Sequence, residues 1–176
     1  MADRNITYSF KAHPTKYRGV QFRSRLEARW ACFFDLIGWR WEYEPIDLEE
    51  WCPDFRVEFP CGHSECGCSH VLLVEVKPYY SIEEFNGHPC KKYLYGVWQK
   101  ANGEVREIPA DASAVFGVNP SVTEWLMCHG AGAGYYTIED WVDGDVNAMW
   151  NQAGNTVQWK PSSRNYRTLY GGGRNA

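Results

Sequence analysis

The chain has 176 residues, 44% of them hydrophobic and 23% charged, which is the composition of one globular domain with a sizeable core. No apolar run approaches the ~18 residues of a transmembrane helix, and the first five residues lack the apolar core of a signal peptide, so we expect a cytoplasmic protein without a membrane partner. Seven cysteines, an odd number with no secretion signal, argue against a disulfide framework.

The net charge of −4 is unevenly spread along the chain. Residues 1–30 carry seven Lys and Arg against two acids, and residues 146–176 carry four against none. Residues 31–145 carry seven against twenty acids. Basic ends around an acidic centre are typical of a metal-binding core with arms that attract phosphate. For residues 160–176 alone, a solvated basic tail is the simpler interpretation.

The first predicted element is a helix over residues 24–38, after a basic loop or irregular strand over residues 1–22. Its apolar residues recur at helical spacing, Ser24 serves as N-cap and Gly38 ends the helix. Short runs rich in β-branched and aromatic residues then predict strands over residues 39–48, 51–59, 71–77, 92–98, 122–128 and 135–138.

A helical turn at residues 81–86 and a helix over residues 145–157 complete the elements. The glycine-rich residues 130–134 predict a flexible turn, because they lack the Lys-Ser/Thr ending of a phosphate loop. A helix, a β-meander and then mixed elements predict an α/β domain with a central mixed sheet. We place this single domain at residues 1–160, with a Cys/His-rich hairpin insertion at 60–70, followed by a flexible basic tail at 161–176.

Two neighbouring predicted strands carry charged residues at their ends. Pro53-Asp54 opens one strand, and Glu75 and Lys77 interrupt the otherwise apolar run of the next. Since successive strand side chains alternate faces, Glu75 and Lys77 point to the same side. Mg²⁺ takes carboxylate oxygens, water and substrate phosphate as ligands, so Asp54 and Glu75 are candidate ligands, with the Val76 carbonyl as a third. Lys77 is placed to orient the attacking water or to stabilise charge on phosphorus.

Glu27 is the fourth candidate, because on the predicted helix it borders the apolar face and leans toward the sheet. Each member of the set also has a plainer interpretation. Glu27 lies three residues after Ser24 and fits the acidic half of a capping box. Glu75 and Lys77 fit an exposed strand-end ion pair, and Pro53-Asp54 fits a turn. One metal site explains all of them together, and we favour it.

The loop between the two catalytic strands holds five potential soft-metal ligands: Cys61, His63, Cys66, Cys68 and His70. Zinc binds Cys and His tetrahedrally, so a structural Zn²⁺ held by the three Cys and either His is one interpretation. An ordinary hairpin with free thiols is the other, because the spacing is not the C-x₂-C pair of a zinc ribbon. Further ligands would join only if the fold brings them near: Cys52, His88, Cys90 and Cys128-His129.

Four segments carry a resemblance to a known family: Arg-Leu-Glu-Ala-Arg-Trp at 25–30, Trp-Glu-Tyr-Glu-Pro at 41–45, Pro-Asp-Phe at 53–55 and Val-Glu-Val-Lys-Pro at 74–78. Together they resemble the PD-(D/E)XK nuclease superfamily, and more narrowly its small phage-borne and prophage-borne members. The match fades after residue 78. The resemblance implies a restriction-endonuclease-like core, a central mixed four-stranded sheet flanked by helices, with magnesium bound by carboxylates. It maps Glu27, Asp54, Glu75 and Lys77 onto the family's catalytic positions.

The sequence therefore predicts a phage-encoded endonuclease that uses Mg²⁺ or Mn²⁺ to hydrolyse phosphodiester bonds in duplex or branched DNA, as a monomer or a homodimer. Candidate contacts to the nucleic-acid backbone are Arg23, Arg25, Lys91 and Lys92, the last two of which also fit a solvated surface pair. The alternative is a non-enzymatic phage protein that uses the same fold to bind nucleic acid or to inhibit a host defence complex, as anti-CRISPR proteins do. The acidic centre of the chain favours the alternative, and the complete set of four catalytic residues favours the enzyme more strongly.

Overall fold

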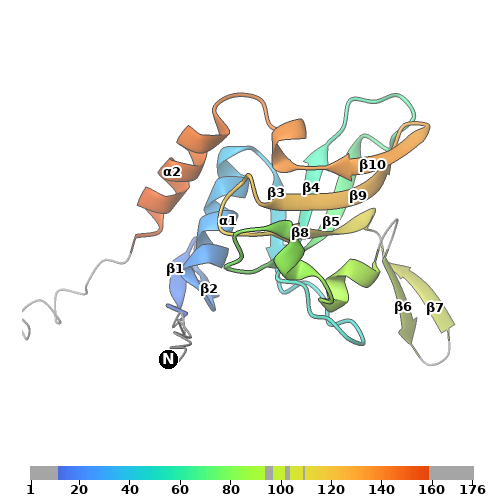
Figure 1. Ribbon diagram of the computed structural model, residues 1–176, viewed down its shortest axis with the longest axis horizontal. Helices are drawn as coiled ribbons and strands as arrows, with labels where there is room; N and C mark the ends of the chain where they lie inside the picture. The colour runs from blue at the N-terminus through green and yellow to red at the C-terminus, as the bar shows by residue number, and fades with distance from the viewer. Residues whose placement is uncertain (1–11, 94–96, 102–103, 109, 159–176) are drawn as a thin grey trace, which may run out of the picture.

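The computed structural model describes residues 12–93, 97–101, 104–108 and 110–158. Its centre is a six-stranded sheet in the order β10-β9-β8-β5-β4-β3 (Figure 1). The strands are β3 (Arg40–Tyr43), β4 (Phe55–Pro60), β5 (Ser69–Val76), β8 (Ala112–Phe116), β9 (Thr123–His129) and β10 (Gly132–Tyr136). Strands β5 and β8 are parallel and all other neighbours in this sheet are antiparallel. The predicted α/β class with a mixed sheet is confirmed, but the sheet has six strands where four were expected.

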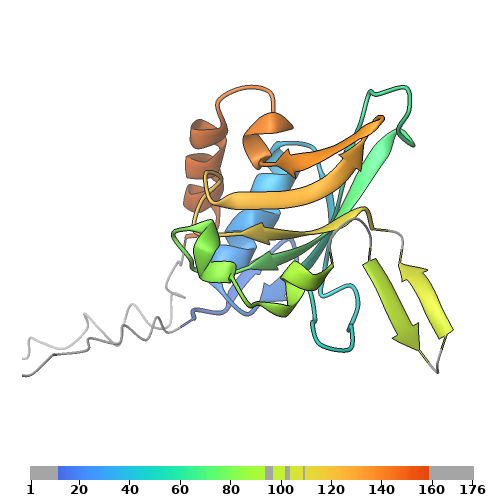
Figure 2. The same cartoon turned by 45° about the vertical axis from the view of Figure 1, so that its right-hand side comes forward.

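Two hairpins lie outside this sheet. Strands β1 (Thr15–Tyr17) and β2 (Val20–Phe22) form one of them, just before the first helix. Strands β6 (Val97–Ala101) and β7 (Glu104–Ile108) form the other, which projects away from the sheet (Figure 2). The β6–β7 hairpin belongs to the long crossover that connects the parallel strands β5 and β8.

Helices α1 (Arg25–Leu36) and α2 (Val146–Thr156) pack on one face of the sheet, where their apolar side chains share a core with the inward residues of β4, β5, β8 and β9. Helix α1 begins at Ser24, whose Oγ accepts the Glu27 N–H at 3.1 Å. Helix α2 begins at Asp145, whose carboxylate accepts the Ala148 N–H at 2.9 Å. Within the described residues, no helix is long and apolar enough to span a membrane.

The opposite face is covered by a thinner layer without an α-helix. It consists of the loop over residues 46–51 and two 3₁₀-helices, η1 (Ile82–Phe85) and η2 (Pro89–Lys92). Their buried side chains form a second apolar cluster with Leu73 and Val115 of the sheet. As a result, the segment that leads into Asp54 and the segment that follows Lys77 both pack on this face.

The predictions over residues 24–38 and 145–157 are confirmed as α1 and α2, and the turn predicted at 81–86 contains η1. The strand predicted over residues 92–98 is wrong at its start, because Lys92 is the last residue of the 3₁₀-helix η2. Its end is confirmed, since Val97 and Trp98 belong to β6, and residues 94–96 lie outside the described part of the chain. The predicted flexible turn at 130–134 is also shorter than expected, since β10 starts at Gly132. The predicted tail at 161–176 lies outside the described residues.

Strand β8 had no counterpart among the predicted elements. Its sequence, Ala-Ser-Ala-Val-Phe, is buried at all five positions and therefore lacks the polar alternation of a strand with one wet face. It nevertheless lies at the centre of the sheet, between β5 and β9. The periodicity on which strand prediction depends is absent where a strand is covered on both faces.

Trp30 of α1 is fully buried at the centre of the helical layer. Its ring lies 4.7 Å from Phe116 and 4.4 Å from Trp150, between centroids, and its Nε1 donates to the Gly117 carbonyl at 3.0 Å. This one side chain therefore joins α1 to α2 and to the end of β8.

We expect Trp30→Ala to lower the free energy of unfolding by about 3–5 kcal/mol, because it leaves a large cavity and an unpaired carbonyl. Urea denaturation followed by circular dichroism measures the change. Tyr80→Ala is the control, since the Tyr80 side chain is 69% exposed, and it should change stability by less than about 0.5 kcal/mol. Equal effects of the two substitutions would contradict this view of the core.

Candidate active site

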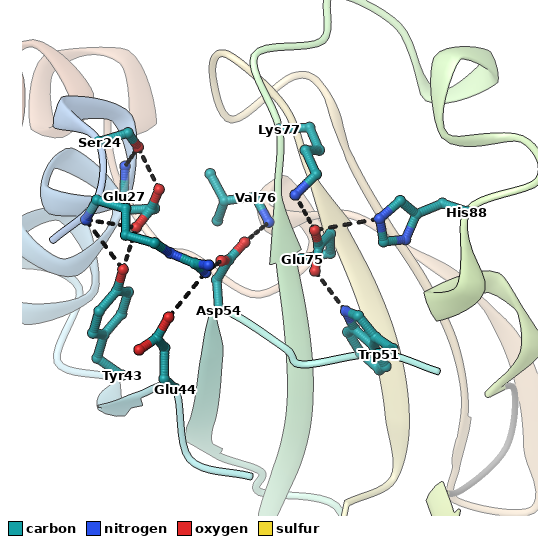
Figure 3. Close-up of polar contacts among 11 residues, drawn as sticks. Ser24, Glu27, Tyr43, Glu44, Trp51, Asp54, Glu75, Val76, Lys77 and His88 are labelled. Atoms are coloured by element: carbon teal, nitrogen blue, oxygen red, sulfur yellow. Dashed lines mark hydrogen bonds and ion pairs between the residues drawn. The ribbon is translucent and has the colours of Figure 1, made fainter. Parts of the chain in front are cut away.

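The predicted carboxylates Asp54 and Glu75 lie side by side at one end of the sheet (Figure 3). Strands β4 and β5 pair with Phe55 opposite Val74, so one step further along this register places Asp54 opposite Glu75. Both side chains are buried, with exposed fractions of 2% and 3%. Two neighbouring carboxylates that are both removed from water repel each other when ionised. Positive charges and hydrogen-bond donors around them are therefore needed to offset this repulsion.

Glu75 is surrounded by three donors. Its Oε2 accepts a hydrogen bond from Trp51 Nε1 at 2.5 Å, and its Oε1 is paired with Lys77 Nζ. His88 Nε2 approaches the same Oε1 at 3.4 Å (Figure 3). The His88 Nδ1 accepts the Cys90 N–H at 3.3 Å, so the neutral ring carries its proton on Nε2, which faces Glu75.

Lys77 contacts Glu75 on the same side of β5, as the spacing of two residues predicts. Burial lowers the pKa of the Lys77 ammonium, but the hydrogen bond and charge of Glu75, together with the charge of Asp54, outweigh it and raise the pKa above its usual value. Lys77 is therefore a fixed positive charge at the end of β5.

Asp54 is held by two donors of a different kind. Arg23 Nη2 donates to Oδ1 at 2.7 Å, and the Val76 backbone N–H donates to Oδ2 at 2.7 Å. The same guanidinium reaches Glu44 Oε1 at 3.1 Å. Burial, followed by the negative charge of Glu75, raises the pKa of Asp54 to about 7, although the Val76 hydrogen bond and Lys77 act in the opposite direction.

Glu27 lies on the far side of Asp54 from Glu75 (Figure 3). Its Oε1 accepts from Ser24 Oγ at 2.6 Å, and its Oε2 accepts from Tyr43 OH at 2.5 Å and from the Arg23 N–H at 3.3 Å. Ser24 is the N-cap of α1, but the Glu27 carboxylate accepts the Arg23 N–H and, within the described residues, no bond from the Ser24 N–H, so the reciprocal half of a capping box is not seen. Arg23 connects the two carboxylates: its backbone N–H donates to Glu27, and its guanidinium donates to Asp54.

A surface hollow of ≈ 340 Å³ lies where the start of α1 meets the end of β5. Glu27 and Lys77 both line it, together with Arg25, which is exposed and has no ion pair within the part of the chain that the structure describes. A ligand in this hollow would meet the Lys77 side chain and an unpaired guanidinium, which suits an anion.

The other predicted nucleic-acid contacts are engaged within the protein. Arg23 is paired with Asp54 and Glu44, Lys91 Nζ lies 2.8 Å from Glu124, and Lys92 is paired with Glu50. Among the four predicted cations, Arg25 alone lacks a carboxylate partner in the described residues. Lys91 and Lys92 are each paired with a carboxylate, whereas the sequence left open a backbone contact to nucleic acid or a solvated surface pair.

Sequence reasoning missed Trp51, His88 and the contact of Arg23 with Asp54. Trp51 lies three residues before Asp54, and a polar-tipped aromatic so close to a predicted ligand was a usable signal. His88 lies thirteen residues after Glu75 and reaches it only because η2 folds back on the sheet. No local pattern indicates that return.

A second group of ligand-type side chains lies at the opposite end of β4 and β5. Ligand atoms of Cys61, Cys66, His70 and His129 all lie within 4.8 Å of one another, a group that could hold a metal ion. Cys68 and His63 are exposed and are not members of this group. Cys68 has a left-handed backbone (φ 69°), and its carbonyl, rather than its sulfur, accepts the Cys61 N–H. In the described residues the carboxylates of Glu27, Asp54 and Glu75 form no such group of three.

Comparison of the chain with family models, with curated proteins and with solved structures gives no match.

Without a divalent cation, wild type should lose stability relative to Asp54→Asn as the pH rises from about 4 to about 7. The folded state holds the Asp54 proton up to about pH 7, whereas the unfolded state releases it near 3.8, so the stabilising contribution is complete below the lower value and lost through the higher one. The change should be on the order of a few kcal/mol. Urea denaturation of both proteins across this range measures it, and a difference that does not depend on pH would contradict the assignment.

Proposed function

We propose that the protein is a metal-dependent endonuclease of the PD-(D/E)XK type that hydrolyses phosphodiester bonds in DNA. The observation that carries the proposal is the burial of Asp54 beside Glu75 at adjacent strand ends, with Lys77 bound to Glu75. Strands β3, β4, β5 and β8 follow α1 in the chain and are consecutive in the sheet, which supports a restriction-endonuclease-like core.

The donor set suits Mg²⁺ or Mn²⁺. Both ions prefer oxygen ligands, and Asp54 and Glu75 supply carboxylate oxygens on adjacent strands, with the Val76 carbonyl as a proposed third ligand. The pKa of Asp54 is raised to about 7 by burial and by Glu75, and a divalent cation between the two carboxylates would remove that repulsion. A bound ion of this kind polarises the phosphate and lowers the pKa of a coordinated water.

The chain's own residues would position the substrate around this pair. Lys77 extends from Glu75 toward the hollow and keeps its charge, so it can neutralise charge that develops on the phosphoryl oxygens. Arg25, exposed in the same hollow, would hold a neighbouring phosphate. Glu27 keeps the start of α1 and Tyr43 together at the edge of the hollow, which makes it a positioning residue in this scheme.

Arg23 must change partner for this chemistry. Its guanidinium now neutralises Asp54 Oδ1, in the place where a divalent cation would supply charge. The side chain is 61% exposed and therefore free to turn toward a phosphate when a cation takes over. Metal binding and release of Arg23 would then be coupled, and an Arg23 freed in this way would add a contact to DNA.

Cleavage of duplex and branched DNA in Mg²⁺ or Mn²⁺ tests the proposal. Asp54→Asn, Glu75→Gln and Lys77→Ala should each reduce the rate by about 10²–10³-fold or more, because each removes a metal ligand or a charge that acts in the transition state. Arg40→Ala, which removes an exposed cation paired with Glu58, is the control and should cleave at the wild-type rate. Wild-type cleavage that persists in excess chelator would exclude a metal-dependent mechanism.

Isothermal titration of Mg²⁺ separates the proposed roles. Lys77→Ala should retain most of the metal affinity, because the ammonium is not a ligand, whereas Asp54→Asn should lose it. Arg23→Ala should bind Mg²⁺ at least as tightly as wild type, since it removes the competitor for Asp54. Equal loss of affinity in Lys77→Ala and Asp54→Asn would show that the division of roles is wrong.

The second candidate function is a non-enzymatic protein that binds nucleic acid or inhibits a host defence complex. One observation favours it: Asp54 is already paired with Arg23 and Glu75 with Lys77, so the site is compensated by the chain's own cations. DNA binding that needs no divalent cation, with no cleavage of any substrate, would favour this candidate over the enzyme.

A further inference from the structure

The Cys/His group has no part in the proposed nuclease chemistry, and it is built from two separate segments, residues 61–70 and the end of β9. Cys61 directly follows β4, Cys66 lies in the loop before β5, His70 is in β5 and His129 ends β9. The described part of the chain holds no other group of three or more Cys, His, Asp or Glu ligand atoms this close together. Chance proximity in one loop does not explain the group, because His129 comes from a distant strand.

His70 is the least satisfied member of the group. It is only 3% exposed, and neither of its ring nitrogens has a hydrogen-bond partner in the described residues. Asp111 Oδ2 lies 3.5 Å from Nδ1, a contact at the limit of hydrogen-bond length that does not meet hydrogen-bond geometry. Because a buried, unpaired imidazole is costly, the site lacks a partner for this ring.

Asp111 is placed to accept a hydrogen bond from a metal-bound His70. Its Oδ2 is fixed by the Val71 N–H at 2.7 Å and lies on the Nδ1 side of the ring, which leaves Nε2 as the metal-facing atom. Histidines that bind metals commonly donate a hydrogen bond from their second ring nitrogen to a carboxylate. This bond fixes the orientation of the ring and raises its basicity.

The two sulfurs are approached by backbone donors. The Gly130 N–H lies 3.2 Å from Cys66 Sγ, and the His63 N–H lies 3.4 Å from Cys61 Sγ. The Gly130 contact also joins the β9–β10 turn to the Cys66 loop.

The sheet is incomplete where the group lies. Strand β8 begins at Ala112, opposite Leu72, so His70 of β5 lies beyond its start. On the other side of β8, Ala114 pairs with Trp125, so His129 of β9 also extends past the start of β8. At this end, β8 as described does not extend between His70 and His129, although Asp111 just before it still donates its N–H to the Val71 carbonyl at 2.7 Å.

We propose that Cys61, Cys66, His70 and His129 bind one structural Zn²⁺ that joins β5 to β9 beyond the start of β8. Two thiolates and two imidazoles complete a tetrahedral site, with no open position for substrate. Trp141 covers it, with ring centroids 5.4 Å from His70 and 5.0 Å from His129. This site does not depend on the nuclease proposal.

Elemental analysis of the full-length protein, purified without chelator, tests the site. Wild type should contain about one equivalent of zinc, and less than about a tenth of an equivalent would overturn the proposal. Cys66→Ser should lose the zinc, whereas Cys68→Ser, a matched change in the same loop at an exposed residue outside the group, should keep it. Loss of zinc from Cys68→Ser with retention in Cys66→Ser would also overturn it.

Three measurements cover the case in which Cys66→Ser does not fold. Co²⁺ added to metal-free wild type should produce the intense visible absorption of a tetrahedral thiolate site, and a weak octahedral spectrum would contradict the geometry. Asp111→Asn keeps all four ligands and should bind zinc about 10–100-fold more weakly than wild type, and unchanged affinity would remove Asp111 from the site. Zinc removal should lower the thermal unfolding midpoint by about 10 °C, and no shift would show that the ion is not structural.

Discussion

The burial of two carboxylates side by side is the constraint on which the rest of this end of the molecule depends. Asp54 and Glu75 are nearly inaccessible to water, and each must find positive charge or donors within the protein. Glu75 contacts the side chains of Trp51, Lys77 and His88. Asp54 accepts hydrogen bonds from the Arg23 guanidinium and from the Val76 N–H. A protein that needed only a stable sheet could place apolar residues at both positions, so these two buried charges lower stability unless their partners offset the loss of hydration.

The surrounding elements are arranged so that these partners arrive from both faces of the sheet. Helix α1 and the preceding β1–β2 hairpin bring Arg23 and Glu27 to one side of Asp54. The 46–51 loop and η2 bring Trp51 and His88 to Glu75 from the other face. The long connection from β5 to β8 thus supplies the lining of the site as well as a crossover.

The local part of the site could be predicted from the sequence, because it depends on short-range geometry. Side-chain alternation places Lys77 beside Glu75, and a hairpin connection places Asp54 on the neighbouring strand. His88 and His129 could not be predicted in the same way, since each reaches its partners through a return of the chain that no local pattern encodes. Strand β8 was missed because burial on both faces removes its periodicity. The strand predicted over 92–98 begins too early, because Lys92 still belongs to the 3₁₀-helix that Pro89 starts.

The central claim is that Asp54 and Glu75 share one divalent cation. A crystal structure of the wild-type protein grown with Mn²⁺, with data collected for anomalous scattering, tests it most directly. The account predicts an anomalous peak between the two carboxylates, with the Arg23 guanidinium displaced from Asp54 Oδ1. An Arg23–Asp54 ion pair that persists, with no peak at the carboxylates under saturating Mn²⁺, would contradict it.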